Sequence, residues 1–140
     1  IYRGWDVNTE GNPYAHTILR GSVNKYGRSR PNYHYEDIMK LFEMYSQRNL
    51  QYPATIVDAN HSNSDKQFKE QIRIVKEVLH SRSLSPDIHR LVKGVMIESY
   101  LVEGTQKIGC QPHVYGQSIT DPCLGWEDSE RLLYEIAERC

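Results

Sequence analysis

The chain has 140 residues and a net charge of -1, with 17 basic residues scattered among 18 acidic ones. This length fits one ordinary domain. Because the charge is mixed and nearly neutral, we expect no binding to nucleic acid or to a membrane surface. No apolar run approaches the roughly 20 residues of a transmembrane helix, and the three cysteines are too irregularly spaced for a disulfide framework. We therefore expect a cytoplasmic protein without membrane or nucleic-acid partners. Because the first residue is Ile1 rather than Met, we also expect that the chain begins inside a longer protein.

The first 19 residues have the pattern of a β-hairpin and strand. Residues 2–7 and 14–19 flank the segment 8–13, whose Asn, Gly and Pro residues favour a turn. The second arm is expected to become a strand that ends at Arg20. Residues 21–33 contain glycines, a proline and several basic side chains, which predicts a loop near an anion.

Two βα units are predicted next. Apolar residues at helical spacing after residue 35 indicate a helix, and residues 54–57 read as a strand. A second helix is expected from about Asp65, because Ser64 and Gln67 have the spacing of a capping box. Ser85 followed by a proline predicts a short helical turn before an apolar strand at residues 94–97.

The rest of the chain is expected to hold an irregular stretch and a final helix from about Asp128. Cys110 and His113 form a Cys-x-x-His pair, but a second pair at zinc-finger spacing is missing from the sequence. The alternation of strands and helices predicts an α/β fold with parallel strands. We divide it into a hairpin and strand, two βα units, and a last loop with its helix, at residues 1–19, 20–60, 61–97 and 98–140.

Polar residues of particular kinds follow the predicted strands. Arg20, His61 and Glu98 lie at or just after the strand ends, where barrel enzymes place their chemistry, and Asp121 ends the later run 116–121. An imidazole with two carboxylates suits Mn²⁺, Fe²⁺, Co²⁺ or Zn²⁺ and can leave coordination positions open. Such a metal is a Lewis acid, and an arginine fork beside it suits a carboxylate or phosphate. These residues indicate a small anionic substrate.

Each of these residues also has a structural interpretation. His61 could be a hydrogen-bonding loop histidine, Asp121 before a proline is an ordinary turn residue, and Arg20 could pair with a neighbouring carboxylate. Glu98 is harder to explain in this way, because a carboxylate at the end of so apolar a strand needs a cation or metal partner.

The sequence segments around these residues resemble a known family. In chain order they are NTEGN (8–12), ILRG (18–21), PNY (31–33), HSNSDKQ (61–67), GVMIES (94–99), LVEG (101–104) and YGQSITDPCLGWED (115–128). Together they resemble the C-terminal part of 3-deoxy-D-arabino-heptulosonate 7-phosphate (DAHP) synthase, type I, of the aromatic-sensitive kind found in bacteria and yeast. The resemblance covers nearly the whole chain.

The resemblance implies a metal-dependent transferase with a (β/α)₈ TIM barrel. Such an enzyme condenses phosphoenolpyruvate with erythrose 4-phosphate and releases phosphate, as the first step of the shikimate pathway to aromatic amino acids. It implies that His61, Glu98 and Asp121 are metal ligands and that Arg20 binds phosphoenolpyruvate. It also gives catalytic roles to Arg20 and His61, and substrate contacts to Arg20, His61 and Asp121.

The chain also departs from that family. The family's fourth metal ligand is a cysteine on an early strand, and this chain lacks that segment; Cys123 matches a different position. Ser22 replaces a usual glycine, and the loop to Pro31 is longer than in the commonest members. About three strands of a barrel leave two open edges, which predicts association with the missing barrel half or self-association as a homo-oligomer. We expect the chain alone to be inactive; the alternative is a non-catalytic metal-binding or assembly module.

Overall fold

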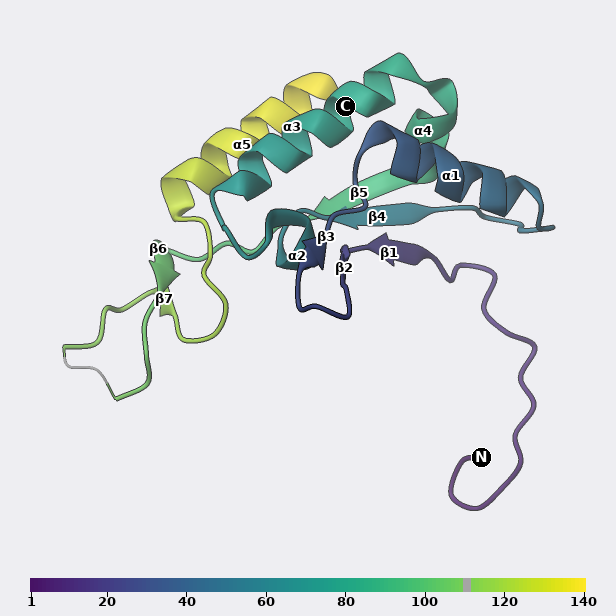
Figure 1. Ribbon diagram of the computed structural model, residues 1–140, viewed down its shortest axis with the longest axis horizontal. Helices are drawn as coiled ribbons and strands as arrows, with labels where there is room; N and C mark the ends of the chain where they lie inside the picture. Colours follow the sequence, from purple (N-terminus) through teal and green to yellow (C-terminus); the bar gives the residue numbers. More distant parts are fainter. Residues whose placement is uncertain (110–111) are drawn as a thin grey trace.

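Three parallel strands form the central sheet of the protein, for which a computed structural model describes residues 1–109 and 112–140 (Figure 1). β1 (Thr17–Leu19) pairs with β4 (Thr55–Asp58), which in turn pairs with β5 (Val92–Met96), so the strand order is β1-β4-β5. Because all three strands run in the same direction, their carboxyl ends meet at one edge of the sheet. The predicted α/β fold with a parallel sheet is therefore confirmed.

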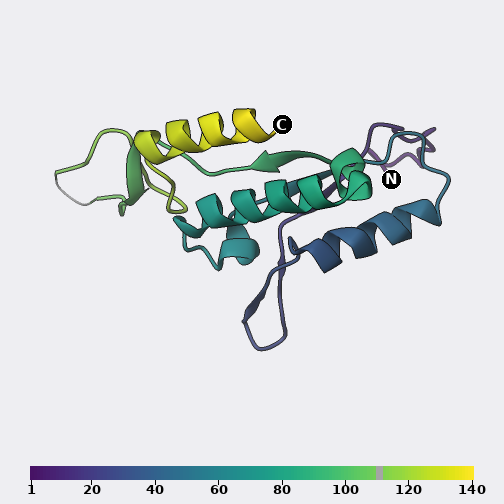
Figure 2. The ribbon, with the colours of Figure 1, turned by 90° about the horizontal axis from the view of Figure 1, so that it is seen from above.

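One face of this sheet carries three long helices and one short one. They are α1 (Tyr35–Ser46), α3 (Glu70–Leu84), α4 (Pro86–Leu91) and α5 (Trp126–Arg139), and they lie on the same side of the strands (Figure 1). From above, α3 lies between α1 and α5 (Figure 2). Ile38 of α1 and Ile74 of α3 are fully buried together with Val57 of the central strand. The hydrophobic core therefore lies between the sheet and its helices.

Among the described residues, no layer of helices covers the opposite face of the sheet (Figure 1), and apolar side chains are exposed there. Ile18, Ile56 and Gly94 are aligned across the three strands. Ile18 is 46% exposed and Met96, two residues after Gly94, is 41% exposed. Side chains alternate between the faces of a strand, so this face is the one that a closed barrel would fill with its interior.

Two small strand pairs accompany the central sheet. β2 (Ser22–Val23) and β3 (Ser29–Arg30) form an antiparallel hairpin within the segment predicted as a loop. Its turn is held by Asn24, whose side-chain oxygen accepts hydrogen bonds from two backbone N–H groups. β6 (Val102–Thr105) and β7 (Gln117–Ser118) pair in parallel within the predicted irregular stretch. Cys110, of the Cys-x-x-His pair in the sequence, lies outside the described residues.

The predicted N-terminal hairpin is wrong. Residues 1–16 contain only an isolated bridge between Tyr2 and Trp5, and the segment runs away from the sheet (Figure 1). The large side chains of Tyr2, Trp5 and Tyr14 are exposed. A two-stranded hairpin is at best marginally stable by itself, and among the described residues this one has no further layer on which to pack.

The start of the second long helix also differs from the prediction. The short helix α2 (His61–Ser64) comes first, a left-handed residue, Asp65, ends it, and α3 begins only at Glu70. The Ser64 hydroxyl donates to the side-chain oxygen of Asn60, so it does not act as the predicted cap. The short helical turn is confirmed as α4, where the Ser85 hydroxyl accepts the N–H of Ile88.

The last two predicted elements are shifted by about two residues. The strand expected at residues 94–97 is Val92–Met96, and the final helix begins at Trp126 rather than near Asp128. Across the part of the chain that the structure describes, none of the helices combines the length and the apolar character that crossing a membrane requires.

Candidate metal and anion site

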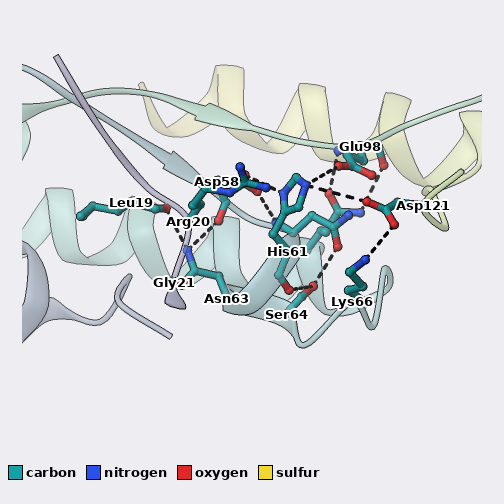
Figure 3. Close-up of polar contacts among 12 residues, drawn as sticks. Leu19, Arg20, Gly21, Asp58, His61, Asn63, Ser64, Lys66, Glu98 and Asp121 are labelled. Atoms are coloured by element: carbon teal, nitrogen blue, oxygen red, sulfur yellow. Dashed lines mark hydrogen bonds and ion pairs between the residues drawn. The ribbon is translucent and has the colours of Figure 1, made fainter. Parts of the chain in front are cut away.

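Three of the predicted site residues converge at the carboxyl edge of the sheet (Figure 3). His61 is the first residue of α2, Glu98 follows β5, and Asp121 follows β7. His61 Nε2 lies 3.3 Å from Glu98 Oε1 and 3.9 Å from Asp121 Oδ2. Each residue offers one ligand atom, and these atoms all lie within 4.8 Å of one another. The structure thus brings together the histidine and the two carboxylates that the sequence singled out.

The orientation of the histidine ring is set by a buried carboxylate. Asp58, the last residue of β4, is 2% exposed, and its Oδ2 lies 2.8 Å from His61 Nδ1. Its other oxygen accepts the N–H of Asn60 at 2.8 Å. When Nδ1 donates its proton to Asp58, the lone pair of Nε2 faces Glu98 and Asp121. Asp58 therefore prepares the ring for a cation between these residues.

The loop after β4 is tied to the end of β1 by Asn63. Its side-chain amide donates to the carbonyls of Leu19 and Asp58 at 2.9 and 2.7 Å. Its oxygen accepts the N–H of Asn32 at 2.9 Å, and the oxygen of Asn32 accepts the N–H of Gly21 at 2.8 Å. This chain of hydrogen bonds holds the backbone beside Arg20 against α2. One network therefore places both the candidate anion-binding residue, Arg20, and His61.

Glu98 is positioned through its backbone by a fully buried side chain of α3. The amide oxygen of Gln71 accepts the N–H of Glu98 at 2.8 Å, and its nitrogen donates to the Glu98 carbonyl at 3.2 Å. The same carbonyl accepts the N–H of Leu124 at 3.0 Å. These bonds leave the Glu98 carboxylate free to face His61.

Arg20 lies beside the cluster, with its Nε 3.9 Å from Asp58 Oδ2. The side chain is 57% exposed, and its ion pair is made through Nε, so that among the described residues its two terminal nitrogens have no partner. It borders a cleft of about 420 Å³ that also reaches His61 and Lys66. The alternative that Arg20 pairs with a neighbouring carboxylate is correct for Nε, yet the planar end of the group is still available to an anion.

Asp121 has a cationic partner and a cysteine neighbour. Lys66 Nζ lies 3.0 Å from Asp121 Oδ1, and the Cys123 thiol donates to the Asp121 carbonyl oxygen at 3.4 Å. Burial raises the pKa of the Cys123 thiol, and the carboxylates of Glu98 and Asp121 raise it further. Cys123 is not among the converging ligand atoms.

Sequence reasoning missed the residues that support the site, chiefly Asp58, Asn63, Lys66 and Gln71. The sequence did contain a signal for Asp58. Like Glu98, it is a carboxylate at the end of an apolar strand, where a buried charge needs a partner. Asn63 and Gln71 act on backbone groups distant in the sequence, and spacing does not reveal such contacts.

The donor set fits a divalent metal ion. One imidazole nitrogen and two carboxylate oxygens converge without a competing cation between them among the described residues. This borderline to hard set suits Mn²⁺, Fe²⁺, Co²⁺ or Zn²⁺, and three protein ligands leave room for substrate or for a further ligand. The predicted metal site therefore has the right chemistry, and the identity of the metal stays open.

Comparison with known proteins assigns the chain to a family. The DAHP synthetase I family model matches residues 4–134. The Trp-sensitive phospho-2-dehydro-3-deoxyheptonate aldolase of Escherichia coli (strain K12) is 44% identical over 131 residues, which cover 92% of this chain and 34% of that protein. The phospho-2-dehydro-3-deoxyheptonate aldolase of Haemophilus influenzae is 41% identical over 133 residues, again over 34% of its length.

A solved structure shows the same likeness. Phospho-2-dehydro-3-deoxyheptonate aldolase from Francisella tularensis SCHU S4 superposes with a TM-score of 0.80 at 34% identity, over 94% of this chain and 36% of that one. The chain thus spans about a third of the length of these relatives. With the family match over residues 4–134 and a curated relative at 44% identity, the chain belongs to the DAHP synthetase I family.

Proposed function

We propose that this chain supplies metal-binding and anion-binding residues of a DAHP synthase active site. The observation that carries the proposal is the convergence of His61, Glu98 and Asp121 to within 4.8 Å, beside the free end of Arg20, in a member of this family. The complete enzyme would condense phosphoenolpyruvate with erythrose 4-phosphate and release phosphate, at the entrance to aromatic amino acid biosynthesis.

The residues of the chain have distinct roles in this proposal. His61, Glu98 and Asp121 hold a divalent metal, which when bound acts as a Lewis acid on the carbonyl of erythrose 4-phosphate. Arg20 binds an anionic group of phosphoenolpyruvate through its exposed guanidinium end, in the cleft that reaches His61. Asp58 keeps Nδ1 of His61 protonated, so that Nε2 faces the metal position.

The fold supports the proposal that further strands complete the site. β1 and β5 are the outer strands of the three-stranded sheet, and the face opposite the helices exposes Ile18 and Met96. Unpaired edges and an apolar face need a partner, which a (β/α)₈ barrel would provide as its remaining strands. We propose that these strands come from a longer polypeptide or from an associated chain, and that the 140 residues alone have no catalytic turnover.

A chimera tests this function. In it, the segment of the E. coli Trp-sensitive relative that aligns with this chain is replaced by this chain, and phosphate release from phosphoenolpyruvate and erythrose 4-phosphate is measured with Mn²⁺. We expect turnover from the chimera and none from the isolated chain. His61→Ala and Glu98→Ala should each abolish the activity of the chimera, whereas His80→Ala, on the surface of α3, should not.

Two outcomes contradict the proposal. A folded chimera that binds Mn²⁺ but has no turnover would favour the alternative, a non-catalytic metal-binding or assembly module. Normal activity in His61→Ala or Glu98→Ala would remove these residues from the active site.

A further inference from the structure

We propose that Lys66 is a positioning residue that holds Asp121 in the orientation required for metal binding. This inference rests on the proposed metal site and adds a residue to it. Lys66 Nζ lies 3.0 Å from Asp121 Oδ1, while Oδ2 of the same carboxylate is the oxygen that lies 3.9 Å from His61 Nε2 (Figure 3). The ammonium group therefore holds the outer oxygen and leaves the inner oxygen to a metal.

The position of the ammonium argues against a simple counter-ion at the metal position. Among the described residues, Lys66 has an ion pair with Asp121 but none with Glu98, and Figure 3 shows it reaching Asp121 from the side opposite Glu98. An ammonium that replaced the metal would have to contact several of the converging ligands. One contact with one outer oxygen is instead the geometry by which neighbouring groups orient a ligating carboxylate.

The backbone that presents Lys66 is strained. Asp65 has a φ of 53° and Lys66 a φ of 59°, and His61 a few residues earlier has a φ of 46°. Non-glycine residues in this region persist only where surrounding contacts determine the conformation, and they gather at functional sites. In the described chain, three of the four such residues lie within this segment. The strain therefore coincides with the residues that present His61 and Lys66 to the cluster.

Two specific contacts hold the strained backbone. The Asp65 side chain accepts a hydrogen bond from the Ser29 hydroxyl at 2.5 Å, which ties it to the β2–β3 hairpin. The N–H of Lys66 donates to the carbonyl of His61 at 3.0 Å. Since an exposed ion pair between flexible side chains is worth little, this fixed backbone is what allows Lys66 to orient Asp121.

Lys69 provides a matched control. Both lysines are largely exposed, at 63% and 61%, and both have a carboxylate partner at about the same distance, 3.0 Å for Lys66 and 2.9 Å for Lys69. The partner of Lys69 is Glu103, which is not among the converging ligands. Loss of either lysine removes the same charge from nearby positions in the sequence, but only Lys66 contacts a ligand.

The test measures Mn²⁺ binding by the 140-residue chain. A titration monitors binding through the loss of the EPR signal of free Mn²⁺. Lys66→Met should weaken binding about tenfold, in the range measured when partners of metal ligands are removed. Lys66→Arg should restore most of the affinity, because it retains a cation for Oδ1, and Lys69→Met should bind as the wild type does. All three changes are on the surface, and circular dichroism checks that the variants keep the wild-type helix content.

The outcomes separate this inference from the function on which it rests. If Lys66→Met binds Mn²⁺ as tightly as the wild type, or more tightly, the positioning role is wrong, because the lysine would then act only as a repelling charge. An equal loss in Lys69→Met would also overturn it, since the effect would be one of general charge. His61→Ala is the reference: retained binding in that variant would overturn the metal site itself.

Discussion

Asp58 Oδ2 lies 2.8 Å from His61 Nδ1, so a carboxylate buried at the end of the central strand fixes the ring that faces Glu98 and Asp121. Asp58 also lies 3.9 Å from Arg20 Nε. One buried side chain thus orients the histidine of the candidate metal site and lies beside Arg20, which borders the neighbouring cleft. The carboxyl end of β4 organises the site, although Asp58 itself is not one of the converging ligands.

Asp58→Asn should weaken Mn²⁺ binding by about 10- to 100-fold, as is typical for partners of metal-bound histidines. Asparagine can still accept the N–H of Asn60, but its amide group no longer stabilises a protonated Nδ1 on His61. Isothermal titration with Mn²⁺ measures the change. Asp87→Asn, which removes the half-buried partner of Arg90, is the control and should not change Mn²⁺ affinity. Unchanged affinity in Asp58→Asn would show that the ring needs no such support.

Gly21→Ala should destabilise the protein more than Gly27→Ala does. Both glycines have a positive φ, 72° and 75°, so the backbone cost is shared. A Cβ at Gly21 would lie 2.8 Å from Ser62 Cβ and 2.9 Å from the Arg30 carbonyl oxygen, whereas at Gly27 it would meet nothing within 4 Å.

The overpacking at Gly21 should lower the free energy of unfolding by about 1–3 kcal/mol beyond the loss in the Gly27 variant. Urea denaturation of the two variants gives the difference directly. Equal losses would mean that the turn after Arg20 does not pack closely against α2 as the structure shows.

Gln71→Leu should lower the free energy of unfolding by about 1–3 kcal/mol, because the N–H of Glu98 would lose its partner in a partly buried position. It should also weaken Mn²⁺ binding, since the backbone that carries the Glu98 carboxylate would be released. Gln67→Leu, at an exposed position, serves as the control for both measurements. Lost stability with unchanged metal affinity would limit Gln71 to a structural role.

The ion pair between Lys76 and Glu135 should make stability depend on pH. Lys76 Nζ lies 2.8 Å from Glu135 Oε2 and joins α3 to α5, and its hydrogen bond lowers the pKa of Glu135 below the ordinary 4.5. A lowered carboxyl pKa stabilises the folded state above the unfolded pKa, and this contribution disappears as the pH falls through the folded value. Glu135→Gln should therefore lose less stability than the wild type when thermal unfolding is compared at pH 6 and at about pH 3. An identical pH dependence would contradict the pairing.

Two of the candidate ligands, His61 and Glu98, could be predicted from local rules. Parallel strands bring their carboxyl ends to one edge, so the polar residues after residues 55–57 and 94–97 had to lie near one another. The apolar strand before Glu98 indicated a carboxylate in need of a cation. Asp121 required the family resemblance as well, because the residues before it carry no strong strand pattern.

The conformation between His61 and Glu70 could not be predicted from local pattern. Ser64 and Gln67 have the spacing of a capping box, yet the chain turns through two left-handed residues there and α3 starts later. The bonds from Asn63 to Leu19 and from Ser29 to Asp65 hold this conformation, and they join residues more than 30 positions apart. Tertiary contacts override the local signal at the segment that carries the site.

The central claim, that His61 is a ligand of a divalent metal in this chain, is tested most directly by pulsed EPR of bound Mn²⁺. In the chimera described above, electron spin echo modulation should show coupling of Mn²⁺ to a ¹⁴N nucleus, because His61 Nε2 faces the two carboxylates. The coupling should disappear in His61→Ala and persist in His80→Ala. A nitrogen coupling that survives in His61→Ala, or its absence from the Mn²⁺-loaded chimera, would contradict the account.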